Sequence, residues 1–305
     1  MATFVPTPVS ARPATLGAMT TTDQLAAVAR NHLTEADAAT WISLLRPGIR
    51  LVPHDGAAPV AARLGGVPRL PADAEWPEWV GYGPLGFIAS VDCAAVAEAG
   101  PLDIAWPKAG TLLFFHYNQD DGFVVIDDPD TQAGARVVYV PADVQTAERP
   151  APEEVEELPE VLLRAEPAAT VPGDYHRAVR DAFPVDADES RRFARRPVND
   201  RRFTRALAEV LDPPEGWHQI GGWAADLQGD VETEAAIVAL GGTPTAEQMA
   251  EEIAEEATRW VLLAQFDTDE SAYLQWGESG MGFWLIRPDD LAAGRFDRAV
   301  FTLQN

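Results

Sequence analysis

The chain has 305 residues, of which 47% are hydrophobic and 23% charged, and this composition excludes an intrinsically disordered protein. Its 48 acidic and 23 basic residues give a net charge of -25, which disfavours binding to nucleic acid or anionic membranes and favours a basic protein partner. The single cysteine, Cys93, excludes an internal disulfide and a multi-cysteine zinc site.

The N-terminal region is predicted to contain a leader and then two helices. Residues 1–19 are proline-rich and lack the charged start and apolar run of a signal peptide, which predicts a flexible leader and a cytoplasmic protein. No stretch reaches the ~20 apolar residues of a membrane span. Apolar residues at helical spacing, and a capping box of Thr34 and Asp37, predict two helices within residues 20–48.

The first β-rich half is predicted over residues 49–149. Short runs rich in β-branched and aromatic residues alternate there with Pro, Gly and Asp clusters, a pattern typical of antiparallel strands joined by turns. The predicted strands are IRLV, LGFIASV, TLLFFHY, GFVVI and ARVVYV.

An acidic, proline-punctuated linker or loop is predicted at residues 150–160, and a second α+β half at residues 161–305. In this half Asp200 predicts the start of one helix and Thr245 the start of another, TAEQMAEEIAEEA. Strands are predicted at VLLRA, WVLLAQF, AYLQW, GFWLI and AVFTL, with a short helix between the last two. Because helices and strands do not alternate regularly, the expected fold class is α+β, with two mainly antiparallel β-units packed as one body and helices at the periphery.

Three segments of the first half recur in the same order in the second. The Gly65-Gly66 turn corresponds to Gly221-Gly222, PLGFIASVD to RWVLLAQFD, and GTLLFF to GMGFWL. The pattern indicates either a duplication or chance, because double-glycine turns and alternating strands are common. A duplication would leave a cleft between the equivalent turns, and such junctions are preferred ligand sites.

These segments also resemble the YwqG-like family, a bacterial domain of unknown function. The resemblance runs over residues 45–305 and is carried by LGGVPRLPADAEWP, PLGFIASVD, WPKAGTLLFF, HQIGGWAADLQGD, LLAQFDTD and WGESGMGFWLIRPDDL. It implies a compact bacterial α+β protein, and it implies no activity, catalytic residue or cofactor.

Five positions measure how closely the chain follows the family pattern. Ser90 stands where the family has glutamine, whereas Gln228 and Gln265 match. Trp223 replaces a tyrosine after the double glycine, and Glu278 replaces an aspartate in a Trp-Gly-Asp motif. The change at Ser90 argues against a ligand contact through that side chain.

The usual catalytic templates are missing from the sequence. The five histidines are widely spaced, there is no HExxH, CxxC, GxSxG or phosphate-binding loop, and we expect no metal or cofactor. Cys93 opens a predicted helix but lacks a neighbouring base, which favours a buried structural thiol. Asp92 and Asp267 end corresponding strands and either act as paired acid and base or cap the following turns.

Two functions from different classes fit these features. The first is a non-enzymatic protein-binding module, protective or toxin-neutralising, that contacts a basic partner through the turn residues Trp76, Trp223 and Trp276. The alternative is a small-molecule binder or enzyme that uses a cleft between the halves. Its site residues would be His218, Gln228, Gln265 and Glu278, and their convergence in one pocket would favour it.

Overall fold

The structure is a computed structural model that describes residues 20–117, 124–185, 196–211, 216–242 and 250–305. The predicted leader lies outside these ranges. Among the described residues, no helix combines the length and the apolar character needed to cross a bilayer.

A ten-stranded antiparallel sheet forms the centre of the molecule. Its strand order is β14-β13-β12-β11-β1-β10-β2-β6-β7-β8, so the two strands at its middle, β1 and β10, are more than 100 residues apart in the sequence. The strands are β1 (Arg46–Pro53), β2 (Ala62–Leu64), β6 (Gly86–Asp92), β7 (Thr111–His116), β8 (Ala135–Val140), β10 (Val161–Thr170), β11 (Gln219–Ile220), β12 (Val261–Asp267), β13 (Met281–Ile286) and β14 (Val300–Gln304). Two small ribbons pair β3 (Arg69–Pro71) with β9 (Thr146–Glu148) and β4 (Glu78–Trp79) with β5 (Gly83–Pro84).

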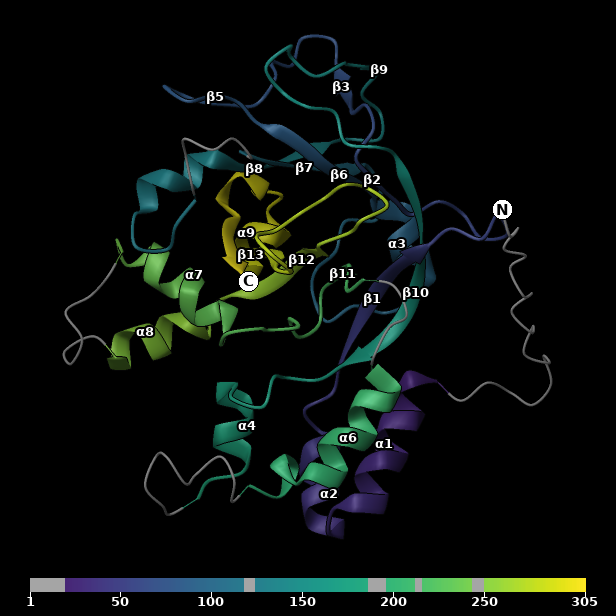
Figure 1. The fold of residues 1–305 in the computed structure, drawn as a ribbon, viewed down its shortest axis with the longest axis vertical. Coiled ribbons are helices and arrows are strands. Elements are labelled where there is room, and N and C mark those ends of the chain that lie inside the picture. Colours follow the sequence, from purple (N-terminus) through teal and green to yellow (C-terminus); the bar gives the residue numbers. More distant parts are fainter. Residues whose placement is uncertain (1–19, 118–123, 186–195, 212–215, 243–249) are drawn as a thin grey trace, which may run out of the picture.

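The sheet curls so strongly that strands far apart in its order share one core. Phe114 of β7 lies edge-on to Phe266 of β12, with 5.1 Å between ring centroids, and to Trp284 of β13, at 5.2 Å. Figure 1 shows β12 and β13 facing β6, β7 and β8 across the interior. Because side chains alternate along a strand, one face of each strand fills this interior and the other packs under loops or helices.

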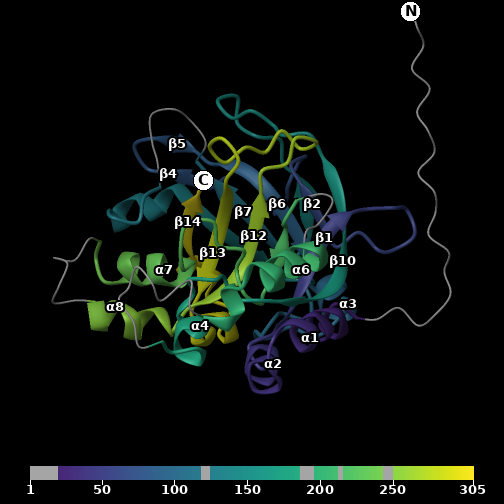
Figure 2. The ribbon, with the colours of Figure 1, turned by 60° about the horizontal axis from the view of Figure 1, so that its bottom comes forward.

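The helices cover the outside of the sheet in two groups. Trp41 and Phe203, with ring centroids 5.2 Å apart, join α2 to α6 in the first group, and α7 packs against β13 and β14 in the second (Figures 1 and 2). The helices are α1 (Thr21–His32), α2 (Glu35–Ile42), α3 (Cys93–Ala99), α4 (Arg177–Ala182), α6 (Arg201–Leu211), α7 (Val231–Ala239), α8 (Ala250–Ala257) and α9 (Pro288–Ala292), with 3-10 turns η1 (Pro129–Gly134), η2 (Pro197–Asn199) and η3 (Phe296–Arg298).

The α+β class and the antiparallel sheet are confirmed, but two predicted strands are wrong. In GFVVI the described residues 124–126 form no strand, because the Thr131 hydroxyl binds both the N–H and the C=O of Val125. In AYLQW the Asp269 carboxylate accepts the N–H groups of Ser271 and Ala272, which closes a tight loop with one isolated bridge to Leu274.

Helix boundaries also differ from the predictions. The second helix ends at Ile42, and β1 already begins at Arg46, because its pairing with β10 extends to the Arg46–Thr170 pair. Helices α4 and α7 were not predicted. The start predicted at Thr245 lies outside the described residues, and α8 confirms the remainder of that helix.

Candidate functional site

A cavity of about 260 Å³ lies between α4, the segment that follows β11, and helices α7 and α8. We call it the His176 pocket. The lining residues that matter for its chemistry are Arg46, His176, Arg180, Trp223, Asp230 and Glu232.

His176 and Glu232 form a buried pair at this pocket, with 8% and 6% of each residue exposed. The Nδ1 atom of His176 accepts the Ala178 N–H at 3.0 Å and so caps α4. The ring proton is therefore on Nε2, which lies 3.4 Å from a Glu232 carboxylate oxygen. Burial favours the neutral ring, but the carboxylates of Glu232, Asp230 and Asp226 together outweigh it and raise the pKa of His176.

Asp230 occupies the N-cap position of α7, yet its side chain makes no capping hydrogen bond. Instead Oδ2 accepts the Arg177 N–H at 3.1 Å and lies 3.7 Å from the Arg180 guanidinium. Among the described residues, its Oδ1 atom is buried without a hydrogen-bond partner. A buried carboxylate oxygen without a donor is costly, so this atom requires an explanation.

Asp226 completes the acidic side of the site. Burial above all, together with the negative charges of Glu232 and Asp230, raises the pKa of its carboxyl to about 8, against the opposing effect of His176. The carboxyl therefore retains its proton at neutral pH. A strongly shifted carboxyl beside a buried histidine is characteristic of functional sites.

Trp223 forms a wall of the pocket and is 7% exposed. The Arg46 guanidinium lies 3.3 Å from its ring centroid, and the His176 ring meets it edge-on at 4.6 Å. Its indole N–H donates to the Leu44 carbonyl at 2.7 Å. The tryptophan predicted at this turn thus faces the inside of the protein.

His218, the residue before β11, lies close to Gln265 of β12, and both side chains bind backbone groups. His218 is 1% exposed, and its Nδ1 accepts the Asp267 N–H at 3.1 Å while Nε2 lies 3.2 Å from Asp269. Gln265 is fully buried, accepts the Ala225 N–H at 3.0 Å and donates to the Trp217 carbonyl at 2.7 Å. These bonds fix the turn after β11 and leave neither side chain facing solvent.

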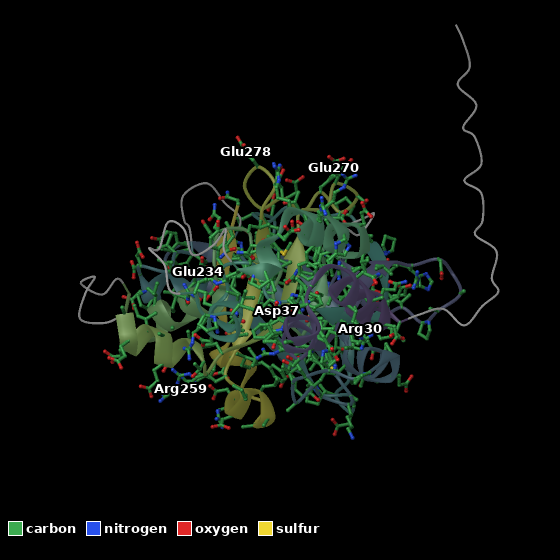
Figure 3. All side chains as sticks on the ribbon, turned by 90° about the horizontal axis from the view of Figure 1, so that it is seen from below. Arg30, Asp37, Glu234, Arg259, Glu270 and Glu278 are labelled. Carbon is green, nitrogen blue, oxygen red and sulfur yellow. The ribbon has the colours of Figure 1, made fainter. Side chains whose placement is uncertain are left out.

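The other predicted site residues lie elsewhere. Gln228 is exposed and binds the Asn305 carbonyl, and Glu278 projects from an exposed loop (Figure 3). Trp276 is 3% exposed and packs edge-on against His116 at 5.1 Å. Trp76 is half-buried, donates to the Leu85 carbonyl at 2.9 Å and lines a separate cavity of about 530 Å³. The four polar residues predicted for one cleft do not converge.

The candidates for nucleophilic and paired-acid chemistry have local structural roles. Asp92 accepts the Ala95 N–H at 2.9 Å and caps α3, and Asp267 accepts the Trp217 N–H at 3.0 Å. Cys93 is fully buried, and burial together with the charge of Asp92 raises its pKa to about 12. Such a thiol is not an activated nucleophile.

Of the residues that line the His176 pocket, Trp223 was predicted, as part of a partner-binding surface, and the others were not predicted as a site. Asp226 and Asp230 stand within the HQIGGWAADLQGD segment that carries the family resemblance, and this is the only signal in the sequence that pointed near them. His176 comes from a distant segment, so only the fold shows their association. Across the ranges that the structure describes, no three His, Cys, Asp or Glu side chains are arranged to hold a metal ion.

Comparison with known proteins identifies the family. A search of curated proteins found no match to the chain. The model of a family described as a domain of unknown function, DUF1963, matches residues 62–304. This match spans most of the chain, including β2, the sheet strands that follow it and the His176 pocket except for Arg46. The chain therefore belongs to the DUF1963 family.

Proposed function

We propose that the protein binds a small polar molecule in the His176 pocket. The observation that carries this proposal is the buried Asp230 oxygen without a donor, in a pocket that also holds the buried His176–Glu232 pair. Ionisable side chains from separate segments converge there, as they do in ligand sites. The volume of about 260 Å³ corresponds to roughly nine waters at ~30 Å³ each, which limits the ligand to the size of a small metabolite.

A thermal-shift screen with small polar metabolites tests this function. We expect at least one compound to raise the Tm of the wild-type protein and to lose that effect in His176→Asn. Asparagine retains the N-cap of α4 but removes the ring contact with Glu232. Glu251→Gln, an exposed change on α8, is the matched control and should keep the full shift. A screen without shifts, or shifts that are equal in all three proteins, would overturn the proposal.

Binding to another protein is a second proposal, and an exposed apolar hairpin supports it. Val80 and Tyr82, at the β4–β5 turn, are 83% and 46% exposed. Exposed apolar groups of this size favour contact with a partner, and the acidic charge favours a basic one. Affinity capture with wild type and with Val80→Asp/Tyr82→Ser should recover one basic partner with the wild type alone. Equal recovery by both proteins would exclude this surface.

We further propose that the chain consists of two related units. Two turns support this: Gly65 and Gly66 have φ angles of 57° and 69°, and Gly221 and Gly222 have 61° and 71°. The N–H of each first glycine donates to a corresponding strand carbonyl, Ile88 in one case and Leu263 in the other.

Strand registers give further support. Arg63 lies opposite Ser90 as Gln219 lies opposite Gln265, and bulges interrupt the next strand pair at Phe87/Ala89 and at Leu262/Ala264. In this scheme β1 and β10 are equivalent first strands, each paired with the second strand of the other unit. A crystal structure tests the proposal, because the rotation that superposes Gly65 on Gly221 must also bring Phe114 onto Trp284. Failure of that superposition would contradict it.

A further inference from the structure

The charges around the His176 pocket are unevenly arranged. The carboxyl groups of Asp230 and Glu232 line the pocket beside His176, and the charges of both carboxylates act on Asp226. The Arg177 and Arg180 side chains, 37% and 52% exposed, line the more open part of the pocket from α4, and the Arg180 guanidinium lies 3.7 Å from Asp230. The pocket thus presents acidic groups inside and guanidinium groups toward solvent.

One carboxylate oxygen of the pocket lacks a donor among the described residues. The side chain of Asp230 is 92% buried, since 8% of it is exposed, and its Oδ1 atom has no hydrogen bond among the described residues. At an N-cap this oxygen would ordinarily accept an N–H from the first turn of the helix, but in α7 it does not. Burial is the main cause of the raised pKa of Asp226, and the charges of Glu232 and Asp230 add to it while His176 opposes it.

The aromatic walls of the pocket are already engaged by the protein's own cations. Arg46 covers Trp223 at 3.3 Å, and Arg287 lies 5.0 Å from the ring centroid of Trp260. A cationic group of a ligand would therefore gain more binding free energy beside the carboxylates than over an aromatic ring.

We propose that the ligand is a small zwitterion of free amino acid type, with its ammonium group at Asp230 and Glu232 and its carboxylate at Arg180. An ammonium group has three donors and can supply the hydrogen bond that Asp230 Oδ1 lacks. Its charge also offsets the negative charges of Glu232 and Asp230, which add to the effect of burial on Asp226. The Arg180 guanidinium, whose only close acid in the described structure is Asp230 at 3.7 Å, can bind a carboxylate. This inference rests on the proposed function of the same pocket.

Isothermal titration calorimetry with the twenty free L-amino acids tests the inference. For the tightest binder we expect the N-acetyl derivative, which lacks the ammonium, and the decarboxylated amine, which lacks the carboxylate, each to bind at least about tenfold more weakly. Asp230→Asn should weaken the free amino acid by a similar factor, because an amide cannot balance the ammonium charge. Glu251→Gln, an exposed change on α8 outside the pocket lining, should leave binding unchanged.

The outcomes separate this inference from the proposed function. If a metabolite of another class binds in a manner that depends on His176 while no amino acid does, the ligand assignment fails and the pocket function stands. Equal binding of the N-acetyl derivative or of the amine also overturns the assignment, and these comparisons require no variant. If neither amino acids nor other metabolites bind, both proposals fail.

Discussion

The side-chain amide of Gln132 binds the backbone of Phe301 on both sides, as a neighbouring strand would. The Phe301 N–H donates to Gln132 Oε1 at 2.8 Å, and Gln132 Nε2 donates to the Phe301 carbonyl at 3.0 Å. Phe301 belongs to β14, one edge of the sheet, and Gln132 belongs to η1, which leads directly into β8, the other edge. One side chain thus links the two edges of the curled sheet and pairs backbone groups of Phe301 at the edge of β14.

Replacement of Gln132 should therefore lower the stability of the protein more than replacement of an ordinary surface glutamine. We expect Gln132→Ala to lower the free energy of unfolding by about 1–3 kcal/mol, because it leaves a backbone donor and a backbone acceptor of Phe301 unpaired. Urea unfolding at pH 7 measures this. Gln275→Ala is the control, since Gln275 is exposed and its side chain bonds only locally, to Gly277. Similar small losses in both variants would show that the edge contact adds little.

Stability should fall as pH rises through the range in which Asp226 stays protonated. The unfolded carboxyl ionises near 3.8, whereas burial raises the folded pKa to about 8, so the folded state binds the extra proton between these values. The raised pKa of His176 makes stability fall with rising pH in the same way, because the folded state keeps the ring proton to a pH above the ordinary pKa of 6.5. The charges of Glu232 and Asp230 act on both His176 and Asp226. We expect the urea midpoint to decrease from pH 5 to pH 9.

Asp226→Asn removes the ionisable group and should flatten that decrease. The stability of the variant relative to the wild type should increase as pH rises, because asparagine never acquires the buried charge. Asp181→Asn, at the exposed rim of the same pocket, should follow the wild-type profile. Parallel profiles for Asp226→Asn and wild type would show that Asp226 titrates as an ordinary carboxyl.

Asp269 should show the opposite dependence on pH. The hydrogen bond from His218, aided by the N–H of Ala272, lowers its pKa from 3.8 to about 2. Its contribution to stability is therefore complete above pH 3.8 and is lost as pH falls through 2. We expect Asp269→Asn to be less stable than wild type at pH 7, with a difference that shrinks toward pH 2. Urea unfolding at several pH values measures it, with the exposed Glu270→Gln as control (Figure 3). A difference that does not depend on pH would disprove the role of charge.

Tyr273 has a φ of 51°, the only positive φ of a non-glycine residue in the described parts of the chain, and it is 73% exposed. A left-handed conformation costs a side-chain-bearing residue roughly 1 kcal/mol, and glycine avoids that cost. We expect Tyr273→Gly to be more stable than Tyr273→Ala by about 0.5–1 kcal/mol, measured by thermal or urea unfolding. At most positions an alanine variant is more stable than a glycine variant. If Tyr273→Ala were likewise more stable than Tyr273→Gly, the assigned backbone conformation would be contradicted.

The sequence by itself determined the local elements and the fold class. Continuous apolar runs predicted the long strands β6, β7, β12 and β13, and the capping box at Thr34 predicted the start of α2. It failed where a single side chain redirects the backbone, as Thr131 does at Val125, since such a bond depends on contacts that no periodicity records. The turn tryptophans were predictable as features of the sequence, but their burial was not.

Only the tertiary structure decided where chemistry is concentrated. His176 and Glu232 are more than fifty residues apart, and their meeting depends on how α4 packs beside α7. The pKa of Asp226 depends on the same packing, because burial and neighbouring charge are properties of position in space. A residue type limits the chemistry that a side chain can perform. The fold decides which of these groups lose water and which charges they face.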